Sequence, residues 1–333
     1  MRFGLALPHY GFSFPEGGPL DWGRLVDHAR RAEGLGFDSV WISDHFFLDL
    51  ARYGGPPEPH AAAEPFTALA GIAVATRRVR LGTLVACTGF RHPAHVVKMA
   101  TTLDLLSEGR MELGLGAGWY EREFRAFGYP FGTAGERFDR LEEFLAVARA
   151  LFGEGEPVDH EGRHFRLHRA YNHPRPAAAG RPPIWVGSKG KPRSARLAAR
   201  YADGWNTVWR WAPQDYRAAA RAMDAACEAE GRDPATLRRS LGLHTLVGEN
   251  DRDLRARYDA LRSWTPGRSL DPEPLESFAA GNLVGTVDAV REQVAAWEAR
   301  GVEELIVSLA SLPFAVADGS LADLFAEGVI HAA

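Results

Sequence analysis

The sequence predicts an α/β fold, a (β/α)8 TIM barrel with loop insertions. Strand-like runs alternate with helix-like runs from one end of the 333 residues to the other. The strand-like runs are apolar without a two-residue alternation, which is typical of parallel strands that are covered on both faces. Eight strand–helix units in a chain of this length fit a closed barrel better than an open sheet.

The expected elements follow one another in regular order. The first strand covers residues 2–7 and ends at Pro8, and Asp21 then begins a helix that Gly36 ends. Further strands are expected over residues 39–43, 79–86, 111–115, 183–186, 204–208, 240–247 and 304–309. Further helices are expected over residues 64–76, 94–106, 135–151, 193–201, 213–230 and 286–300.

Residues 1–333 are expected to form a single domain, since neither a charge shift nor a Gly/Ser-rich linker divides the chain. Three connections exceed the usual loop length, at approximately residues 46–65, 152–182 and 248–283. Long loops in compact domains tend to be lids or binding segments. We therefore interpret these three connections as insertions in the barrel.

Composition and charge exclude several classes of protein. Hydrophobic residues make up 46% of the chain and charged residues 25%, which excludes disorder and collagen-like structure. The net charge of -4 argues against nucleic-acid or anionic-membrane partners bound through bulk electrostatics. No apolar stretch approaches the roughly 18 residues of a membrane span. Cys87 and Cys227 form no CxxC pair, so we expect a cytoplasmic protein without a disulfide framework.

Residues 160–164 have the HExxH lettering of zinc proteases, His160-Glu161-Gly162-Arg163-His164. That chemistry needs a helix, because only helical spacing brings both histidines to one metal. Pro157 and Gly162 contradict a helix, and the surrounding pattern predicts a strand, a turn and a second strand. Four other histidines near strand ends have packing or hydrogen bonding as their default interpretation: His9, His92, His95 and His244. No metal site is therefore expected.

Two glycine-rich segments follow predicted strands. The first, Gly114-Leu115-Gly116-Ala117-Gly118, fails the GxGxxG dinucleotide fingerprint, because Trp119 or Glu121 stands where the third glycine should be. What remains is a strand end at which backbone approaches a flat ligand closely, or else a tight turn at the barrel rim.

The second segment, Gly187-Ser188-Lys189-Gly190-Lys191, lies between a strand and the start of a helix. Free backbone N–H groups and the helix dipole favour an anion there. Two of the three lysines of the chain fall in this loop, and Arg193 adds positive charge. It is not a P-loop, because Pro192 follows the Gly-Lys pair. We interpret the loop as a phosphate site rather than as a solvated basic turn.

Asp44 and His45 close the second predicted strand, and the carboxyl ends of barrel strands face the active site. A carboxylate beside a histidine orients the ring for proton transfer near neutral pH. Adjacent strand residues point to opposite faces, so a structural role for one of the two stays open. The pair is the candidate catalytic site of the sequence.

A set of motifs occurs in order along nearly the whole chain. It comprises Phe37-Asp38-Ser39-Val40-Trp41 before Asp44-His45, Arg80-Leu81-Gly82-Thr83, Arg91-His92-Pro93, Thr102-Leu103-Asp104, Gly116-Ala117-Gly118-Trp119, and residues 198–206. As a set the motifs are specific, whereas any one alone is weak. In this set the chain resembles the luciferase-like monooxygenases, including the branch that uses the deazaflavin F420. The resemblance implies the same barrel, with a flavin or F420 ring over the carboxyl ends of the strands.

The resemblance also implies which residues bind the cofactor. Asp44 and His45 would meet the ring region, with His45 as the catalytic proton donor or acceptor. Val85, Ala86 and Thr88 would belong to a backbone bulge that packs against the ring. The ring edge would be framed by Gly116, Ala117, Gly118 and Trp119, and the phosphate would be held by Gly187, Ser188, Lys189 and Gly190. The insertion at 248–283 would cover the substrate, and a homodimer would be the assembly.

One residue departs from the family pattern. In the F420-dependent sugar and alcohol dehydrogenases a glutamate follows the glycines of strand four, where this chain has Trp119. A role for that acid cannot be carried over, which argues against sugar or alcohol oxidation. Aromatic residues near the rim, Phe12 and Trp209 among them, indicate an apolar pocket.

Three functions stay open. An F420-dependent oxidoreductase would transfer hydride to or from a small organic substrate, and the basic cluster around Lys189 suits the acidic tail of F420. With FMN as the alternative cofactor, the chain would be a monooxygenase that uses reduced flavin and oxygen. In either case a flavin or F420 reductase would be the electron-donating partner. A flavin-binding protein without turnover is the third reading, and the Asp44-His45 pair argues against it.

Overall fold

The computed structural model describes residues 1–177, 180–266, 270–271 and 273–332. The chain forms two compact units, which we describe one at a time. Unit 1 comprises residues 1–64, 207–219 and 239–333. Unit 2 comprises residues 65–206 and 220–238. Each unit has its own parallel strands and covering helices.

The centre of unit 1 is a set of parallel strands, with β1 (Arg2–Ala6) between β2 (Ser39–Ile42) and β14 (Glu304–Ser308). Leu5 is in register with Val40 on one side and Val307 on the other. The long strand β12 (Arg238–Gly248) pairs with β14 and, further along, with β13 (Leu283–Thr286). The carboxyl ends of these strands therefore share one edge of the unit.

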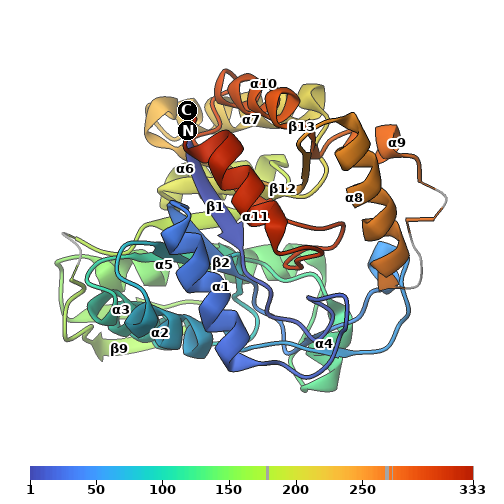
Figure 1. Ribbon diagram of the computed structural model, residues 1–333. Helices are drawn as coiled ribbons and strands as arrows, with labels where there is room; N and C mark the ends of the chain where they lie inside the picture. Colours follow the sequence, from blue (N-terminus) through green and yellow to red (C-terminus); the bar gives the residue numbers. More distant parts are fainter. Residues whose placement is uncertain (178–179, 267–269, 272, 333) are drawn as a thin grey trace. The chain divides into compact units, whose positions relative to one another are not determined.

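The helices of unit 1 follow these strands. They are α1 (Trp22–Gly34), α8 (Asp251–Trp264), α9 (Leu275–Ala279), α10 (Val287–Glu298) and α11 (Ser320–Phe325), and a π-helical turn follows over Ala326–Ile330. The Asp21 side chain caps α1 by accepting the Arg24 N–H at 3.2 Å, as expected of an N-cap aspartate. In Figure 1, α1 and α11 lie beside β1.

Unit 2 is also built on parallel strands. In it β7 (Met111–Gly116) lies between β5 (Arg80–Thr83) and β10 (Ile184–Gly187), and β10 pairs with β11 (Gly204–Val208). A short strand, β6 (Ala86–Cys87), joins the carboxyl end of β7. The predicted strand over residues 79–86 is therefore too long, because the chain leaves the sheet after Thr83 and returns at Ala86.

Six helices belong wholly or largely to unit 2. They are α2 (Pro65–Ala75), α3 (Pro93–Leu106), α4 (Glu121–Ala126), α5 (Ala134–Phe152), α6 (Pro192–Tyr201) and α7 (Pro213–Ala229). A capping box of Thr133 and Glu136 begins α5, and the His92 ring accepts the Ala94 N–H at the start of α3. Local capping thus fixes where these helices start.

Each unit buries a glutamate at the start of a strand. In unit 1 Glu304, 2% exposed, accepts hydrogen bonds from the Ser39 hydroxyl and, at 3.3 Å, from the Trp41 indole N–H. In unit 2 Glu112, 1% exposed, accepts the Trp185 indole N–H at 2.6 Å. Buried carboxylates need such partners. These polar groups lie at the amino ends of the strands, away from the strand ends that carry the candidate site.

The three insertions contain secondary structure. Residues 46–65 include the antiparallel pair β3 (Phe47–Leu48) and β4 (His60–Ala61) and a 3₁₀ turn over Ala51–Tyr53. Residues 152–182 include the hairpin of β8 (Val158–Glu161) and β9 (Arg166–Ala170). Residues 248–283 include α8 and α9. Residues 178–179, 267–269 and 272 of these insertions lie outside the described residues.

All eight predicted strands and all seven predicted helices are present. Four helices were not predicted, namely α4, α8, α9 and α11. Within the part of the chain that the structure describes, no helix has the length and apolar character of a membrane span.

Candidate active site

The Asp44-His45 pair lies just beyond β2 in unit 1, with Ser43 between it and the last strand residue, Ile42. Asp44 is 4% exposed, whereas the His45 side chain is half-buried. The His45 ring lies 6.3 Å from the Tyr10 ring, measured between centroids. The two neighbours therefore differ in solvent exposure: the His45 side chain is partly exposed, and Asp44 is buried.

A buried hydrogen-bond chain supports this strand end. His9 Nδ1 lies 2.8 Å from the Leu7 carbonyl oxygen, and His9 Nε2 lies 3.0 Å from Ser43 Oγ. Because a carbonyl only accepts, Nδ1 carries the proton, so Nε2 accepts from the Ser43 hydroxyl. The Ser43 oxygen in turn accepts from the Tyr10 hydroxyl, which makes a short contact with it. The direction of the whole chain is thereby fixed, from Tyr10 through Ser43 to His9.

Burial keeps His9 neutral. It lowers the pKa of His9 to about 3, against the opposing effect of the hydrogen bond to Leu7, and the nearby His45 lowers it further. The hydrogen-bonded series of Tyr10, Ser43 and His9 therefore orients these side chains, and His9 does not act as a base near neutral pH. Sequence reasoning had placed His9 near a strand end with packing or hydrogen bonding as its default role, and the structure confirms this. The residues it missed are Tyr10 and Ser43, which carry no signal beyond flanking His9 and Asp44.

Aromatic rings extend from this chain across the strand ends of unit 1. Tyr10 stacks on Phe12 with 4.7 Å between centroids, and Phe314 meets His9 edge-on at 4.8 Å. Trp209 meets Phe314 edge-on at 5.9 Å. These rings form a mostly buried cluster in unit 1 that reaches the ring of His45, and the predicted apolar pocket stays a prediction.

In unit 2, Val85 packs onto the glycines at the ends of β7 and β10. A Cβ added to Gly116 would lie 2.7 Å from Val85 Cγ2, and one added to Gly187 would lie 2.8 Å from Val85 Cγ1. The Leu84–Val85 peptide bond is cis. The Val85 side chain therefore occupies the side of these glycines on which a Cβ would lie, and the predicted close approach of a ligand stays a prediction.

Hydrogen bonds hold the segment that follows Val85. Ala86 is in register with Leu115, and the Thr88 N–H and hydroxyl both donate to the Gly116 carbonyl, at 3.0 and 3.1 Å. The structure thus brings together Val85, Ala86, Thr88, Gly116 and Gly187, all five predicted to be cofactor-binding. They form a rigid ledge at the carboxyl ends of the unit 2 strands.

The residues after Gly116 turn away from the strand. Gly118 has a φ of +80°, and a Cβ there would lie 2.6 Å from Cys87 Sγ, so the turn requires glycine. Ala117 is half-buried, and Trp119 is 41% exposed with its ring 5.2 Å from Tyr120. That Gly116 to Trp119 border the edge of the cofactor ring stays a prediction.

The predicted phosphate loop connects β10 to α6. The Ser188 N–H donates to the Asn206 carbonyl at 2.9 Å, and the Trp205 indole N–H donates to the Ser188 carbonyl at 3.1 Å. The Gly190 N–H, at a φ of +71°, donates to Ser188 Oγ at 3.3 Å. The loop is therefore fixed while the first turn of α6 presents its N–H groups.

The positive charge of this loop comes from two lysines. Lys189 and Lys191 are exposed. Arg193, in contrast, forms an ion pair with Asp139 and donates to the Gly135 carbonyl at 3.1 Å. The predicted contribution of Arg193 is therefore wrong, because Asp139 of α5 neutralises its guanidinium.

The HExxH residues form the predicted hairpin. His160 Nε2 lies 3.1 Å from Glu143 Oε1, and Glu143 also accepts the His164 and Phe165 N–H groups. Glu143 therefore organises a turn here. Over the described residues, no group of three His, Cys, Asp or Glu side chains has metal-binding geometry.

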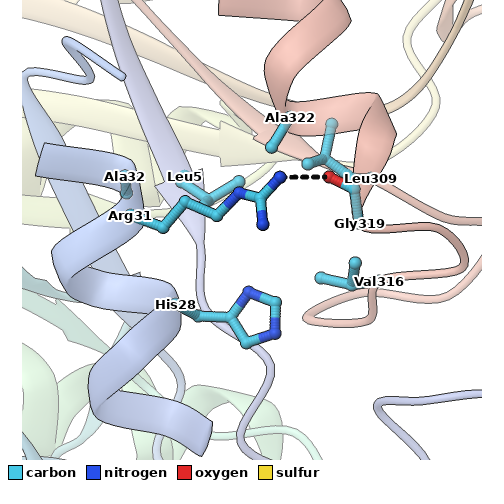
Figure 2. Close-up of a pocket in the computed structure, with 8 residues that line it drawn as sticks. All are labelled: Leu5, His28, Arg31, Ala32, Leu309, Val316, Gly319 and Ala322. Carbon is cyan, nitrogen blue, oxygen red and sulfur yellow. Dashed lines mark hydrogen bonds between the residues drawn. The ribbon is translucent and has the colours of Figure 1, made fainter. Parts of the chain in front are cut away.

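A cavity in unit 1 lies between α1 and α11 (Figure 2). Arg31 crosses it to reach the Gly319 carbonyl at 3.3 Å and also pairs with Asp323. Burial, with Arg24 and Arg31 nearby, lowers the pKa of His28 to about 4. The cavity volume of about 10 Å³ holds one water at most, so it is no substrate site.

Parallel strands alternate with helices in both units, a half-buried histidine follows one strand, and a glycine-rich loop with two exposed lysines precedes one helix. The family model described as luciferase-like monooxygenase matches residues 1–304. The chain belongs to this family. The predicted fold class, a (β/α)8 TIM barrel, is confirmed.

Relatives include oxidoreductases of both expected kinds. The chain is 37% identical over 273 residues to the F420-dependent hydroxymycolic acid dehydrogenase of Mycobacterium tuberculosis, covering 79% of this chain and 72% of that one. It is 30% identical over 330 residues to the phthiodiolone/phenolphthiodiolone dimycocerosates ketoreductase of Mycobacterium bovis, covering 84% and 85%. The solved structure of monooxygenase RslO1 from Streptomyces bottropensis matches all of both chains, at 27% identity and a TM-score of 0.78.

Proposed function

We propose that the protein is an F420-dependent oxidoreductase that transfers hydride to or from a small organic substrate. One observation carries the proposal: the likeness, over 79% of the chain, to a dehydrogenase named for its dependence on F420. The likeness to a ketoreductase over 84% of the chain supports the same chemistry, the interconversion of hydroxyl and carbonyl groups.

The residues at the unit 2 strand ends fit such a cofactor. The ledge of Val85 to Thr88 offers backbone and small side chains to a flat ring, held in place by the Gly116 carbonyl. The first turn of α6 and the exposed Lys189 and Lys191 suit the phosphate and the acidic tail. F420, when bound, supplies a ring that carries hydride. Gly187, Ser188 and Gly190 would complete the phosphate site, and Gly116 to Trp119 the frame of the ring.

His45 is the residue that would hold or release the proton. Hydride transfer between a hydroxyl and a carbonyl group also moves one proton, and a half-buried imidazole at a strand end suits that step. Asp44 would contribute its carboxylate from the enclosed side. The chain of His9, Ser43 and Tyr10 would hold this strand end in one geometry.

An FMN-dependent monooxygenase is the second candidate. The likeness to monooxygenase RslO1 over the whole chain favours it. The ledge and the phosphate loop suit either F420 or FMN. An assay therefore needs to resolve one difference between the two candidates, namely whether the reduced cofactor reacts with oxygen.

The deciding experiment is an equilibrium titration of the purified apoprotein with F420 and with FMN, each oxidised and reduced, followed by fluorescence. We expect tight binding of F420 alone. Preference for reduced FMN, with oxygen consumption coupled to product, would make the protein a monooxygenase. Binding of neither cofactor would refute both candidates. The variant Arg196→Ala is a matched control for surface charge, since Arg196 is exposed on α6 and pairs with Glu142.

We further propose that the protein acts in the cytoplasm as a homodimer of single-domain chains, with a flavin or F420 reductase as electron donor. Neither Cys87 nor Cys227 is part of a disulfide and both are buried, which suits a reducing compartment. One family model covers residues 1–304, which suits a single domain. Light scattering of the purified protein would measure twice the chain mass if the dimer forms.

A further inference from the structure

His244 lies at the strand-end edge of unit 1 that also carries His45. Strand β12 places His244 opposite Ser308 of β14, one residue beyond the pair of Val307 with Leu5. Ala6, the next residue of β1, is in turn opposite Trp41 of β2. His244 is therefore level with the carboxyl ends of β14, β1 and β2, from which His9 and His45 emerge.

One nitrogen of the His244 ring has no hydrogen-bond partner among the described residues, namely Nδ1. The side chain is fully enclosed, at 4% exposure of the residue. Burial and Arg210 lower the pKa of His244 to about 3, and a hydrogen bond to the Ala310 backbone opposes them. A bond that favours the protonated ring is one that the ring donates, so Nε2–H faces the Ala310 carbonyl. Nδ1 is then an unprotonated nitrogen whose lone pair accepts no hydrogen bond from the described residues.

The His244 ring belongs to the cluster of aromatic rings in unit 1. The Trp209 ring stacks on the His244 ring with 5.0 Å between centroids and an angle of 23°. Trp209 also meets Phe314, which meets His9, and Tyr10 lies beyond it next to His45. A continuous row of rings thus connects His244 to His45 within unit 1.

The loops that carry these rings have unusual backbone conformations. Trp209, Arg210 and Phe314 have φ values of 49°, 51° and 57°, a region that bulky residues rarely adopt. Such conformations cost free energy, persist where surrounding structure enforces them, and cluster at ligand sites. Arg210 is held there by two hydrogen bonds to Glu273, at 2.8 and 2.7 Å. The orphaned nitrogen is the observation that points to a ligand, and Trp209 of one of these loops stacks on the ring that carries it.

We propose that His244 Nδ1 accepts a hydrogen bond from a hydroxyl group of the substrate, with Trp209 and Phe314 packing against the apolar part of the same molecule. The inference rests on the proposed function and deepens it. Because Nδ1 only accepts, it recognises an alcohol and gives nothing to a ketone carbonyl. The substrate class is therefore an alcohol with an apolar body, contrary to the expectation from Trp119 that alcohol oxidation is disfavoured.

The test compares two substitutions at one position. His244→Gln places an amide near Nε2 and keeps a donor for Ala310 but removes the acceptor at Nδ1. His244→Asn places its carbonyl oxygen near Nδ1 and keeps the acceptor. The probes are cyclohexanol and cyclohexanone, which differ only in hydroxyl against carbonyl. Binding is measured on the full chain without cofactor and again with F420.

We expect His244→Gln to weaken cyclohexanol binding about tenfold and to leave cyclohexanone unchanged, a loss typical of one hydrogen bond to a buried acceptor. His244→Asn should stay within about threefold of the parent protein for both probes. Equal losses for the two probes, or no preference of the parent protein for the alcohol, would overturn the proposal.

A second readout does not depend on the variants folding. In protein with ¹⁵N-labelled histidine, the His244 Nδ1 resonance should have the position of a bare nitrogen and move toward lower frequency on addition of cyclohexanol. No movement up to the solubility limit of cyclohexanol, or a resonance already bonded to an ordered water and unaffected by it, would overturn the proposal. Failure of F420 to bind while this movement persists would refute the proposed function alone.

Discussion

Replacing Gly116 by alanine should destabilise the ledge in unit 2 by a mechanism that a second substitution reverses. The new Cβ would lie 2.7 Å from Val85 Cγ2, a separation that real Cβ atoms do not show. The Gly187 backbone borders Val85 on another side, since a Cβ added to Gly187 would lie 2.8 and 2.9 Å from the two methyl carbons of Val85. Either the β7 end or the segment after Val85 has to move.

The expected cost of Gly116→Ala is about 1–3 kcal/mol, typical of overpacking. Val85→Ala removes two methyl groups from a half-buried side chain and should cost about 1 kcal/mol. If the clash is the cause, the double variant is no less stable than Val85→Ala alone, since the remaining neighbours, Val85 Cβ at 3.9 Å and the Gly187 carbonyl oxygen at 4.0 Å, are at ordinary contact distances. The coupling free energy is then about 1–3 kcal/mol, well above the few tenths expected of independent sites.

The assay is urea unfolding of the parent protein, both single variants and the double variant, with the slopes compared as well as the midpoints. Gly34→Ala is the matched control: the last residue of α1 has no atom within 4 Å of its added Cβ, so alanine should be neutral or stabilising there. Additive free energies in the double variant would refute the packing argument. A parallel F420 titration should show weaker binding for Gly116→Ala, because the ledge shifts.

Four further predictions follow from the site. His45→Ala should lower turnover by about 10²–10⁴-fold with cofactor affinity retained, and unchanged turnover would remove its catalytic role. Lys189→Ala with Lys191→Ala should weaken cofactor binding and reduce its dependence on salt, whereas Arg196→Ala should do neither; equal salt dependence in all three proteins would exclude the phosphate loop. Stability should fall as the pH drops from 6.5 toward 3, because His9 and His244, whose pKa values are lowered to about 3 in the folded protein, take up protons on unfolding. At pH 5 each histidine should lower the free energy of unfolding by about 1–2 kcal/mol. His9→Gln should make the urea midpoint less dependent on pH. Treatment with a metal chelator should change neither the unfolding midpoint nor the turnover, and a loss that zinc restores would contradict the hairpin interpretation of His160 to His164.

Strand and helix order could be predicted because it depends on local pattern. Apolar runs that end in proline, glycine or an acidic residue specify β1 and β2, and Asp21 specifies the start of α1. The helix α8 was missed because its sequence is dominated by arginine and aspartate, with only Leu254, Tyr258 and Leu261 buried, too sparse a stripe to stand out.

The site could be predicted only where residue type alone carries the chemistry. Asp44, His45 and the loop at Gly187 have that character. The packing of Val85 onto Gly116 and Gly187 could not be read from spacing, because it joins residues about 30 and 100 positions apart through shape. The prediction that Arg193 adds positive charge to this loop failed for the same reason. Its partner Asp139 belongs to another helix, and the sequence does not show which residue pairs with a charged side chain.

The histidines of unit 1 differ in burial, and their roles differ accordingly. Enclosure keeps His9 and His244 neutral, and each donates one ring proton to a backbone carbonyl, so neither exchanges protons near neutral pH. Burial also lowers the pKa of His60. His45 is the half-buried ring just beyond β2, next to a carboxylate. If the protein moves a proton at these strand ends, His45 moves it, while His9 fixes the strand that carries it and His244 holds the substrate.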